Sequence, residues 1–413
     1  MNNNTTYKDS PLGKIPSDWE VKKIKDIAKI TSGTTPLRSE MSYHTNGTIN
    51  WVKTTDLNNS TILDTEEKIT EVALQKTSLR IYPKGTVLVA MYGGFNQIGR
   101  TGLLGIDATI NQALSALTVD INQINQKFLL EWFNGNVGLW KNLAGSSRKD
   151  PNINSKDVGD FPFLEISLPE QTRIAEVLST WDKAISNVQS TIEQAELRNK
   201  WLMQELLTGK RRLKGFSNDW KEYSYEKLLK VVKRSFDWDE NHLYKLISVR
   251  RRSGGIFYRD ALYGHQILVK NLRTVKVGDF LFSKMQILHG ASALVTKEFE
   301  GAMISGSYIA VVAKEAKILN MEYFQWYSKM AYFYHQTYIS SYGVHIEKMT
   351  FDFDTFLQLE MNLPSFEEQN AIIQVLQVAD KEVQLLKSKL KKMKEQKKGL
   401  MQVLLTGKKR LKV

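Results

Sequence analysis

The chain has 413 residues, of which 42% are apolar and 24% are charged, and its formal net charge is +13. A chain of this length exceeds one ordinary hydrophobic core, so we expect two to four domains. The composition is typical of globular proteins and excludes a wholly disordered chain. The absence of cysteine excludes a disulfide framework and a thiolate metal site. The excess of basic side chains favours a polyanion, such as nucleic acid, as partner.

Targeting segments are not evident. No run of about 18 apolar residues suggests a membrane span. The N-terminus lacks the basic segment and apolar core of a secretory signal. We therefore expect a cytoplasmic protein.

Residues 1–165 are of domain size and contain the apolar–polar alternation of β-strands. Lys84–Ala90 places a turn glycine before a buried strand, and a glycine-containing loop, Met91–Gln97, follows it. Arginine and amide side chains recognise base edges, while lysine and serine more often hold phosphates. The candidate DNA contacts of this segment lie on predicted loops and are Asn96, Gln97, Arg100, Ser146, Ser147, Arg148 and Lys149.

Residues 166–210 are predicted to form one long helix. Ser167 and Glu170 have capping-box spacing, no glycine or proline occurs from Glu170 to Thr208, and Gly209 supplies a C-terminal stop. Apolar residues recur at alternating spacings of four and three, as in a coiled coil. The positions expected to pair are Ile174, Leu178, Trp181, Ile185, Val188, Ile192, Leu202 and Leu206, with a polar break at Asn199.

Residues 211–362 again have the size and patterning of a mixed domain. Val277–Ser283 resembles Lys84–Ala90, and the glycine-containing loop Lys284–Gly290 follows it. An aromatic run, Tyr323–Tyr342, could stack bases, but its helical spacing favours a place in the core. The candidate DNA contacts are Arg250, Arg251, Arg252, Lys284, Gln286, His289, Tyr342 and His345.

Residues 363–413 repeat the first helix. Ser365–Lys412 aligns without a gap to Ser167–Lys214 at a constant offset of 198 residues, with 21 of 48 pairs identical. We interpret this as a duplication whose two helices pair with each other; the alternative is that each helix packs separately on its own domain. The pairing positions of this copy are Ile372, Leu376, Val383, Leu386, Leu390, Leu400 and Leu404, with a polar break at Lys397.

Enzyme signatures are missing from the sequence. It contains no phosphate-binding G-x-x-x-x-G-K-[ST] loop, no G-x-S-x-G elbow and no motif of an adenine methyltransferase. The six histidines have no paired metal-ligand spacing. We therefore expect a chain that is not catalytic and holds no metal or cofactor.

The duplicated helices resemble those of the specificity subunits of type I restriction-modification systems. The matching residues are the helix entrances Leu168–Gln171 and Leu363–Gln369, the Asp-Lys pairs at Asp182 and Asp380, and the two Leu-Leu-Thr-Gly-Lys ends. Gly13–Trp19 is similar to the entry of the family's first recognition domain.

The resemblance implies an α+β chain with two α/β target-recognition domains, separated by two long helices that pair as an antiparallel intramolecular coiled coil. Each domain would recognise one half of a split site in double-stranded DNA. The helices would dock two modification subunits, which bind S-adenosylmethionine and methylate adenine, and restriction subunits would cleave DNA with ATP and Mg²⁺. A helix of about 38 residues would be about 57 Å long, which suits a spacer between half-sites.

Three alternatives stay open from the sequence. One is a coiled-coil scaffold protein without DNA specificity. Another is an enzyme with an unrecognised site. The third is a specificity subunit of a related single-chain or phase-variable system.

Overall fold

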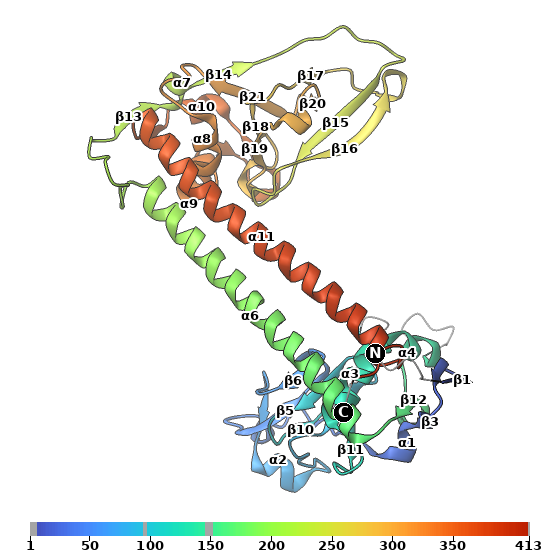
Figure 1. Ribbon diagram of the computed structural model, residues 1–413. Coiled ribbons are helices and arrows are strands. Elements are labelled where there is room, and N and C mark those ends of the chain that lie inside the picture. Colours follow the sequence, from blue (N-terminus) through green and yellow to red (C-terminus); the bar gives the residue numbers. More distant parts are fainter. Residues whose placement is uncertain (1–5, 94–96, 145–151, 412–413) are drawn as a thin grey trace. The chain divides into compact units, whose positions relative to one another are not determined.

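The computed structural model describes residues 6–93, 97–144 and 152–411 (Figure 1). They form two compact units: residues 1–189 with 388–413, and residues 190–387. Each unit contains one α/β domain together with part of each long helix. The predicted fold class, two α/β domains with two long helices, is confirmed.

The two long helices are α6 (Leu168–Leu207) and α11 (Phe366–Leu404), with 40 and 39 residues. At the start of α11, Oγ of Ser365 accepts a hydrogen bond of 3.3 Å from the backbone N–H of Glu368. Gly209 and Gly407 follow the helices with φ of 69°, the left-handed conformation that ends a helix most easily when the residue is glycine. Local capping therefore sets the helix bounds near those expected from the sequence.

Within each unit the two helices run antiparallel. Later residues of α11 pair with earlier residues of α6, as an antiparallel pair requires. The ion pairs are Asp182–Lys397 and Glu170–Arg410 in the first unit, and Glu196–Lys387 and Arg198–Glu382 in the second.

The first domain is built on a five-stranded sheet in the order β4-β11-β8-β9-β6, with smaller sheets β10-β5-β7, β12-β3 and β1-β2. Its strands are β1 (Tyr7–Ser10), β2 (Gly13–Pro16), β3 (Glu20–Lys23), β4 (Ala28–Ser32), β5 (Ile49–Val52), β6 (Ser60–Ile62), β7 (Lys68–Ile69), β8 (Val87–Ala90), β9 (Thr101–Leu104), β10 (Thr109–Ile110), β11 (Leu114–Val119) and β12 (Pro162–Glu165). Its helices are α1 (Ile24–Ile27), α2 (Glu71–Lys76), α3 (Gln126–Gly135), α4 (Val137–Leu143) and α5 (Ser155–Asp160).

The second domain contains sheets in the orders β14-β21-β18-β19, β16-β15-β20-β17, β13-β24 and β22-β23. Its strands are β13 (Lys221–Ser224), β14 (Leu229–Val232), β15 (Leu243–Val249), β16 (Ile256–Tyr263), β17 (Leu272–Thr274), β18 (Phe280–Ser283), β19 (Ser292–Leu294), β20 (Met303–Ser305), β21 (Tyr308–Ala313), β22 (Ser341–Tyr342), β23 (Thr350–Phe351) and β24 (Glu360–Leu363). Its helices are α7 (Tyr225–Leu228), α8 (Met321–Tyr327), α9 (Ala331–Ile339) and α10 (Phe353–Leu357).

The two domains share one topology. The central antiparallel order β4-β11-β8-β9 of the first domain recurs as β14-β21-β18-β19 in the second. The parallel pair β5 and β10 likewise recurs as β15 and β20. The duplication seen in the helices therefore extends to the fold of the domains, although their sequences resemble each other only weakly.

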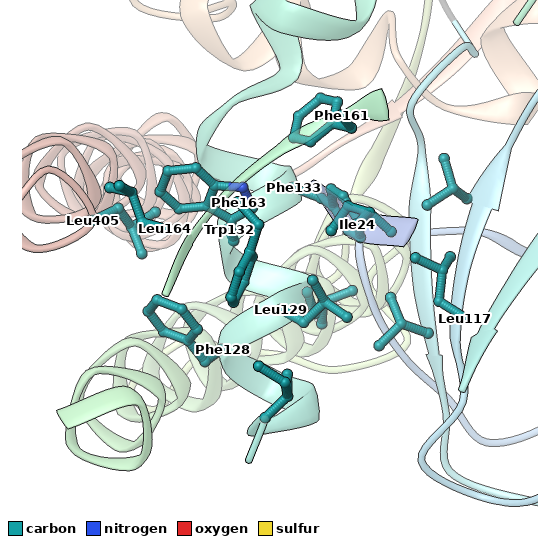
Figure 2. Close-up of a cluster of buried hydrophobic side chains, with 14 of the residues drawn as sticks. Ile24, Leu117, Phe128, Leu129, Trp132, Phe133, Phe161, Phe163, Leu164 and Leu405 are labelled. Carbon is teal, nitrogen blue, oxygen red and sulfur yellow. The ribbon is translucent and has the colours of Figure 1, made fainter. Parts of the chain in front are cut away.

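The middle strands β8 and β18 of the two central sheets are buried on both faces. Val87 and Val89 of β8 pack into a cluster with α3, β12 and the end of α11, while Leu88 and Ala90 pack into a second cluster on the other face. The alternation follows from the two-residue period of a strand. Figure 2 shows the first cluster, in which α3 contributes Phe128, Leu129, Trp132 and Phe133, and β12 contributes Phe163 and Leu164. Phe161 directly precedes β12, and Leu405 follows α11.

Candidate nucleic-acid interface

An arginine after α11 joins the first domain to both long helices. The carboxylate of Glu170, at the start of α6, accepts hydrogen bonds of 2.6 and 2.8 Å from Arg410. Arg410 also donates two bonds of 3.0 Å to Asp18, and its guanidinium lies 5.3 Å from the ring centre of Trp19. The side chain of Glu170 is only 3% exposed, so this pairing offsets the cost of burying its charge.

The second domain repeats this clamp. Arg212 donates two hydrogen bonds of 2.6 Å to Glu368 and one of 2.9 Å to the backbone oxygen of Asn218, and it lies over the ring of Trp220. The sequence predicts that the carboxylates of Glu170 and Glu368 complete capping boxes, and this prediction needs correction. Both carboxylates accept hydrogen bonds from an arginine instead. The arginine–glutamate pair and the tryptophan beside it thus recur in both domains.

The glutamine that follows each glutamate fixes a loop. Nε2 of Gln171 donates to the backbone oxygens of Gln123 and Ile166, and its Oε1 accepts from the N–H of Asn125, the N-cap of α3. In the second unit, Gln369 accepts in the same way from the N–H of Asn320, the N-cap of α8. The paired Glu-Gln residues at the helix entrances are therefore buried structural anchors.

The predicted helix-pairing positions are buried or half-buried without exception. The polar break of the second copy, Lys397, forms ion pairs with Asp182 at 2.7 Å and Glu131 at 3.0 Å. The equivalent Asn199 has a buried Oδ1 that accepts no hydrogen bond within the described residues. The two breaks thus have different chemistry, and the role of these positions in register stays a prediction.

Burial changes the chemistry of Glu131, which lies on α3. Its side chain is 4% exposed, and this burial raises the pKa of its carboxyl to about 7. The positive charge of Lys397 acts in the opposite direction, and the nearby carboxylate of Asp182 adds to the rise.

Two of the predicted contact segments of the second domain lie against each other. They are the arginine turn (Arg250–Gly255), which follows β15, and the glycine loop (Lys284–Gly290), which follows β18. Two backbone hydrogen bonds, of 2.5 and 2.9 Å, join them. Nε of Arg251 also donates to Oε1 of Gln286 at 2.6 Å. The fold therefore brings together basic and amide side chains that are about 30 residues apart in sequence.

The junction of these segments depends on unusual backbone conformations. Arg252 and Ser253 have positive φ of 57° and 52°, and Oγ of Ser253 lies 2.9 Å from Oη of Tyr334 on α9. Gly290 has φ of 72°, and a Cβ there would lie 2.0 Å from the same hydroxyl. A side chain is thus excluded where the loop passes α9.

The third predicted segment adjoins the glycine loop. The backbone oxygen of Lys284 accepts a hydrogen bond of 3.0 Å from the N–H of Phe351 on β23. Tyr342 lies on the paired strand β22 and is 65% exposed, and His345 is exposed in the connection between the two strands. The candidate contacts of the second domain therefore cluster; that each touches DNA stays a prediction.

The first domain holds a similar glycine loop after β8. Gln97 is half-buried and Arg100 is exposed. Gly99 has φ of 73°, and a Cβ there would lie 2.3 Å from the ring of Trp140 on α4. This contact matches that of Gly290 with α9. Asn96, Ser146, Ser147, Arg148 and Lys149 lie outside the described residues, and their predicted role stays a prediction.

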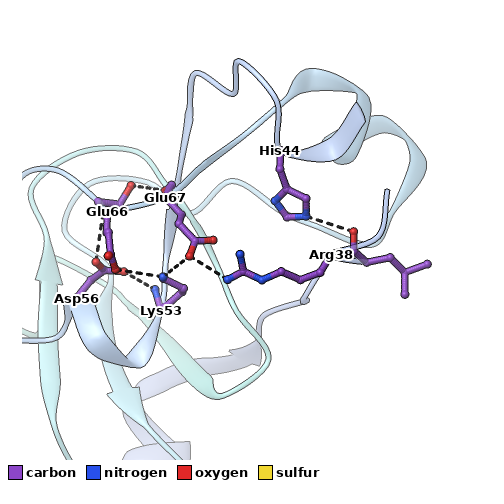
Figure 3. A network of polar contacts seen from close by, with 8 residues as sticks. Arg38, His44, Lys53, Asp56, Glu66 and Glu67 are labelled. Atoms are coloured by element: carbon purple, nitrogen blue, oxygen red, sulfur yellow. Dashed lines mark hydrogen bonds and ion pairs between the residues drawn. The ribbon is translucent and has the colours of Figure 1, made fainter. Parts of the chain in front are cut away.

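Sequence reasoning missed a polar network that follows β5, the counterpart of β15. Nζ of Lys53 donates to Glu67 at 2.6 Å and to Glu66 at 3.3 Å, and Arg38 donates to Glu67 at 2.9 Å (Figure 3). Burial alone would lower the pKa of Lys53, but these carboxylates outweigh it and raise the pKa. The arginine turn of the second domain follows β15. At the equivalent place after β5, the first domain has Lys53, whose charge is already paired with two glutamates.

Within the ranges that the structure describes, no group of three or more histidine, aspartate or glutamate side chains is arranged to hold a metal ion. The helices of the same ranges include none with the length and apolar character needed to span a membrane.

The fold and the repeated clamp define a chain of two homologous α/β domains on a duplicated helix. Residues 16–197 match the model of the type I restriction modification DNA specificity domain. The resemblance of this chain to type I specificity subunits is confirmed.

Relatives of the same kind match over part or all of the chain. The type I restriction enzyme MjaIX specificity subunit of Methanocaldococcus jannaschii is 32% identical over 188 residues, which are 44% of this chain and 42% of that protein. The EcoR124I/EcoR124II specificity subunit of Escherichia coli is 24% identical over 47% of this chain and 48% of its own length. The chain thus spans about half of these two relatives. The putative MjaX specificity subunit of M. jannaschii is 24% identical over 98% of this chain and 97% of its own length.

Solved structures share the fold. The type I S subunit from M. genitalium superimposes with a TM-score of 0.56 at 13% identity and covers 98% of this chain, with 97% of that chain matched. A chain from a structure of type I R-M complex assembly gives a TM-score of 0.61 at 14% identity, covering 95% of this chain and 99% of that one.

Proposed function

We propose that this chain is the sequence-specific DNA-binding subunit of a type I restriction-modification complex and has no catalytic activity of its own. The first target-recognition domain (1–165) and the second (211–362) each recognise one half of a bipartite DNA site. The central helix (166–210) and the C-terminal helix (363–413) act as spacer and as docking surface for two modification subunits.

One observation supports this proposal most strongly: the two domains share topology and clamp but differ in the chemistry of their loops. The arginine turn of the second domain stands where the first has the paired Lys53. Side chains that contact base edges determine which DNA sequence is recognised. Two domains with one scaffold and different loops can therefore recognise two different half-sites.

The charge of the chain supports DNA as the ligand. A net charge of +13 favours association with phosphates, which release counterions when basic side chains approach them. The clustered arginine turn and glycine loop offer guanidinium groups, which pair with guanine or with phosphate, and amide groups, which pair with adenine.

The proposal assigns the chemistry to other subunits. S-adenosylmethionine would bind the modification subunits, and ATP and Mg²⁺ the restriction subunits. This chain would work with them in the cytoplasm and contribute the choice of DNA sequence.

The alternative is a coiled-coil scaffold without DNA specificity. The two functions differ in how binding to duplex DNA responds to salt. A specificity subunit should bind a duplex with an affinity that falls steeply as salt rises, whereas a scaffold should not.

Methylome sequencing tests the proposal directly. A host without other modification systems should express this chain together with its modification subunit. We expect adenine methylation at one bipartite motif, and none when this chain is omitted. Methylation that is identical with and without the chain would contradict the proposal.

A further inference from the structure

A basic pocket opens between the arginine turn, the glycine loop and the segment after α8. It has a volume of about 610 Å³, and its polar lining comes from Arg251, Arg252, Ser253, His289, Lys329 and Tyr334. The described residues that line it include no carboxylate. Basic and hydroxyl groups thus line one concavity together with the apolar side chains of Met203 and Leu288.

Lys329 is the member of this lining that sequence reasoning did not single out. It is half-buried, and its Nζ lies 3.9 Å from the ring centre of Trp326. Burial lowers the pKa of Lys329, and the charge of Asp380 opposes this only in part. The ion pairs of the described residues include none between Lys329 and a carboxylate, and Asp380 acts on it only through its charge. An anion in the pocket would therefore offset the cost of burying the ammonium.

The first domain has an amide side chain where the second has Lys329. Lys329 lies nine residues after Asn320, the N-cap of α8, and the residue nine positions after the equivalent N-cap Asn125 is Asn134. Its Oδ1 accepts from the hydroxyl of Thr101 at 2.6 Å, and its Nδ2 donates to the backbone oxygen of Asn59 at 2.9 Å. Both polar atoms of the Asn134 amide are thus hydrogen-bonded within the first domain. A lysine at this position occurs in the second domain and not in the first.

We propose that the pocket of Arg251, Arg252 and Lys329 binds a phosphate of the DNA backbone beside the half-site of the second domain. The inference rests on the proposed DNA-binding function and deepens it. Lysine and serine side chains often hold phosphates, and the planar guanidinium of arginine can donate two parallel hydrogen bonds to one phosphate, so a concave site lined by these groups suits this anion. The contact would position the domain on DNA and leave its sequence preference unchanged.

The test compares the full-length chain with Lys329→Met, which keeps length and removes charge. Binding is measured against salt on a duplex with the motif found by methylome sequencing and on an unrelated duplex. We expect Lys329→Met to reduce the slope of log K against log [salt] by about 1 and to weaken binding to both duplexes by about tenfold. The matched control is Lys230→Met, on the exposed edge strand β14, which should keep the wild-type slope.

A second variant distinguishes loss of a phosphate contact from loss of folding. Arg252→Asn removes another charge, and asparagine tolerates the positive φ of 57° at this position. It should also reduce the salt slope by about 1, with an unfolding midpoint like that of the wild type.

Three results would overturn the inference. If both variants keep the wild-type slope while the wild type binds DNA, the pocket is not a phosphate site and the proposed function stands. If Lys329→Met keeps DNA binding but no longer co-purifies with the modification subunit, the occupant is an acidic group of a protein. If the wild type shows no salt-dependent binding to either duplex, the proposed function fails as well.

Discussion

Glu131 lies on α3 with its carboxylate 3.0 Å from Nζ of Lys397, which in turn pairs with Asp182. Burial raises the pKa of Glu131 to about 7 from an ordinary 4.5, so the folded chain holds this proton more tightly than the unfolded chain. The stability that the protonated group contributes is complete below about pH 4.5 and is lost as the pH rises through about 7.

We therefore expect Glu131→Gln, which is neutral at every pH, to remove this dependence. Between pH 4.5 and 7 the variant should gain about 1 to 3 kcal/mol in free energy of unfolding relative to the wild type. Calorimetric unfolding across this pH range measures the difference. The control Glu176→Gln, at an exposed position of α6, should follow the wild-type curve. Parallel curves for Glu131→Gln and wild type would show that the carboxyl titrates normally.

Gly290 offers a second test at the residue scale. A methyl group there would meet Oη of Tyr334 at 2.0 Å, whereas at Gly278, with a similar φ of 87°, it would meet nothing within 4 Å. Gly278→Ala should cost about 1 kcal/mol from backbone strain alone, and Gly290→Ala a further 1 to 3 kcal/mol, roughly, from overpacking. Chemical denaturation compares them, and equal losses would mean that α9 moves aside without cost.

At the scale of elements, the long helices were predictable because their signals are local. Ser365, Gly209 and Gly407 cap or end helices by contacts with near neighbours, and the heptad spacing is visible in one stretch of chain. The sheet orders were not predictable. Strand β4 pairs with β11, more than 80 residues later, and no sequence pattern near β4 indicates which strand is its partner.

The candidate site was predictable only in part, for the same reason. The arginine turn and the glycine loop were identified by composition, but their contact depends on tertiary packing. Lys329 was missed because it lies within an aromatic run whose helical spacing indicated core. Tyr323, Phe324 and Phe333 of that run are indeed buried, while the lysine between them lines a pocket.

The helix pair makes a prediction about spacing. A four-residue turn inserted after Ser190 in α6, with a matched turn after Lys387 in α11, keeps the antiparallel ion pairs of each unit aligned. The added length of about 6 Å should lengthen the recognised spacer by about one to two base pairs and leave both half-sites unchanged. Methylome sequencing of the variant measures this.

The control is the same insertion in α6 alone. It moves the part of α6 after Ser190 by about one turn relative to α11. The ion pairs Arg198–Glu382 and Asp182–Lys397, which lie on opposite sides of the insertion, then cannot both form. We expect loss of methylation from the single insertion. Altered half-sites after the matched insertion would contradict the role of the helices as a spacer.

At the scale of the whole molecule, the chain is a duplicated unit in which the end of each helix copy clamps a domain. Arg212 and Arg410 bind the equivalent glutamates Glu368 and Glu170, and Trp220 and Trp19 lie beside them. The two halves of the chain share the clamps, the glutamine anchors and the helices, and they differ in their loops. The proposed function assigns sequence choice to the loops alone.

Exchange of residues 213–362 for the second domain of another specificity subunit tests this central claim most directly. The exchange leaves α6, α11 and the first domain intact, and methylome sequencing reports the motif that the hybrid complex modifies. We predict a motif in which one half-site changes and the other is identical to that of the parent. Retention of the parental motif, or a change in both halves, would contradict an account in which each domain recognises one half of the site.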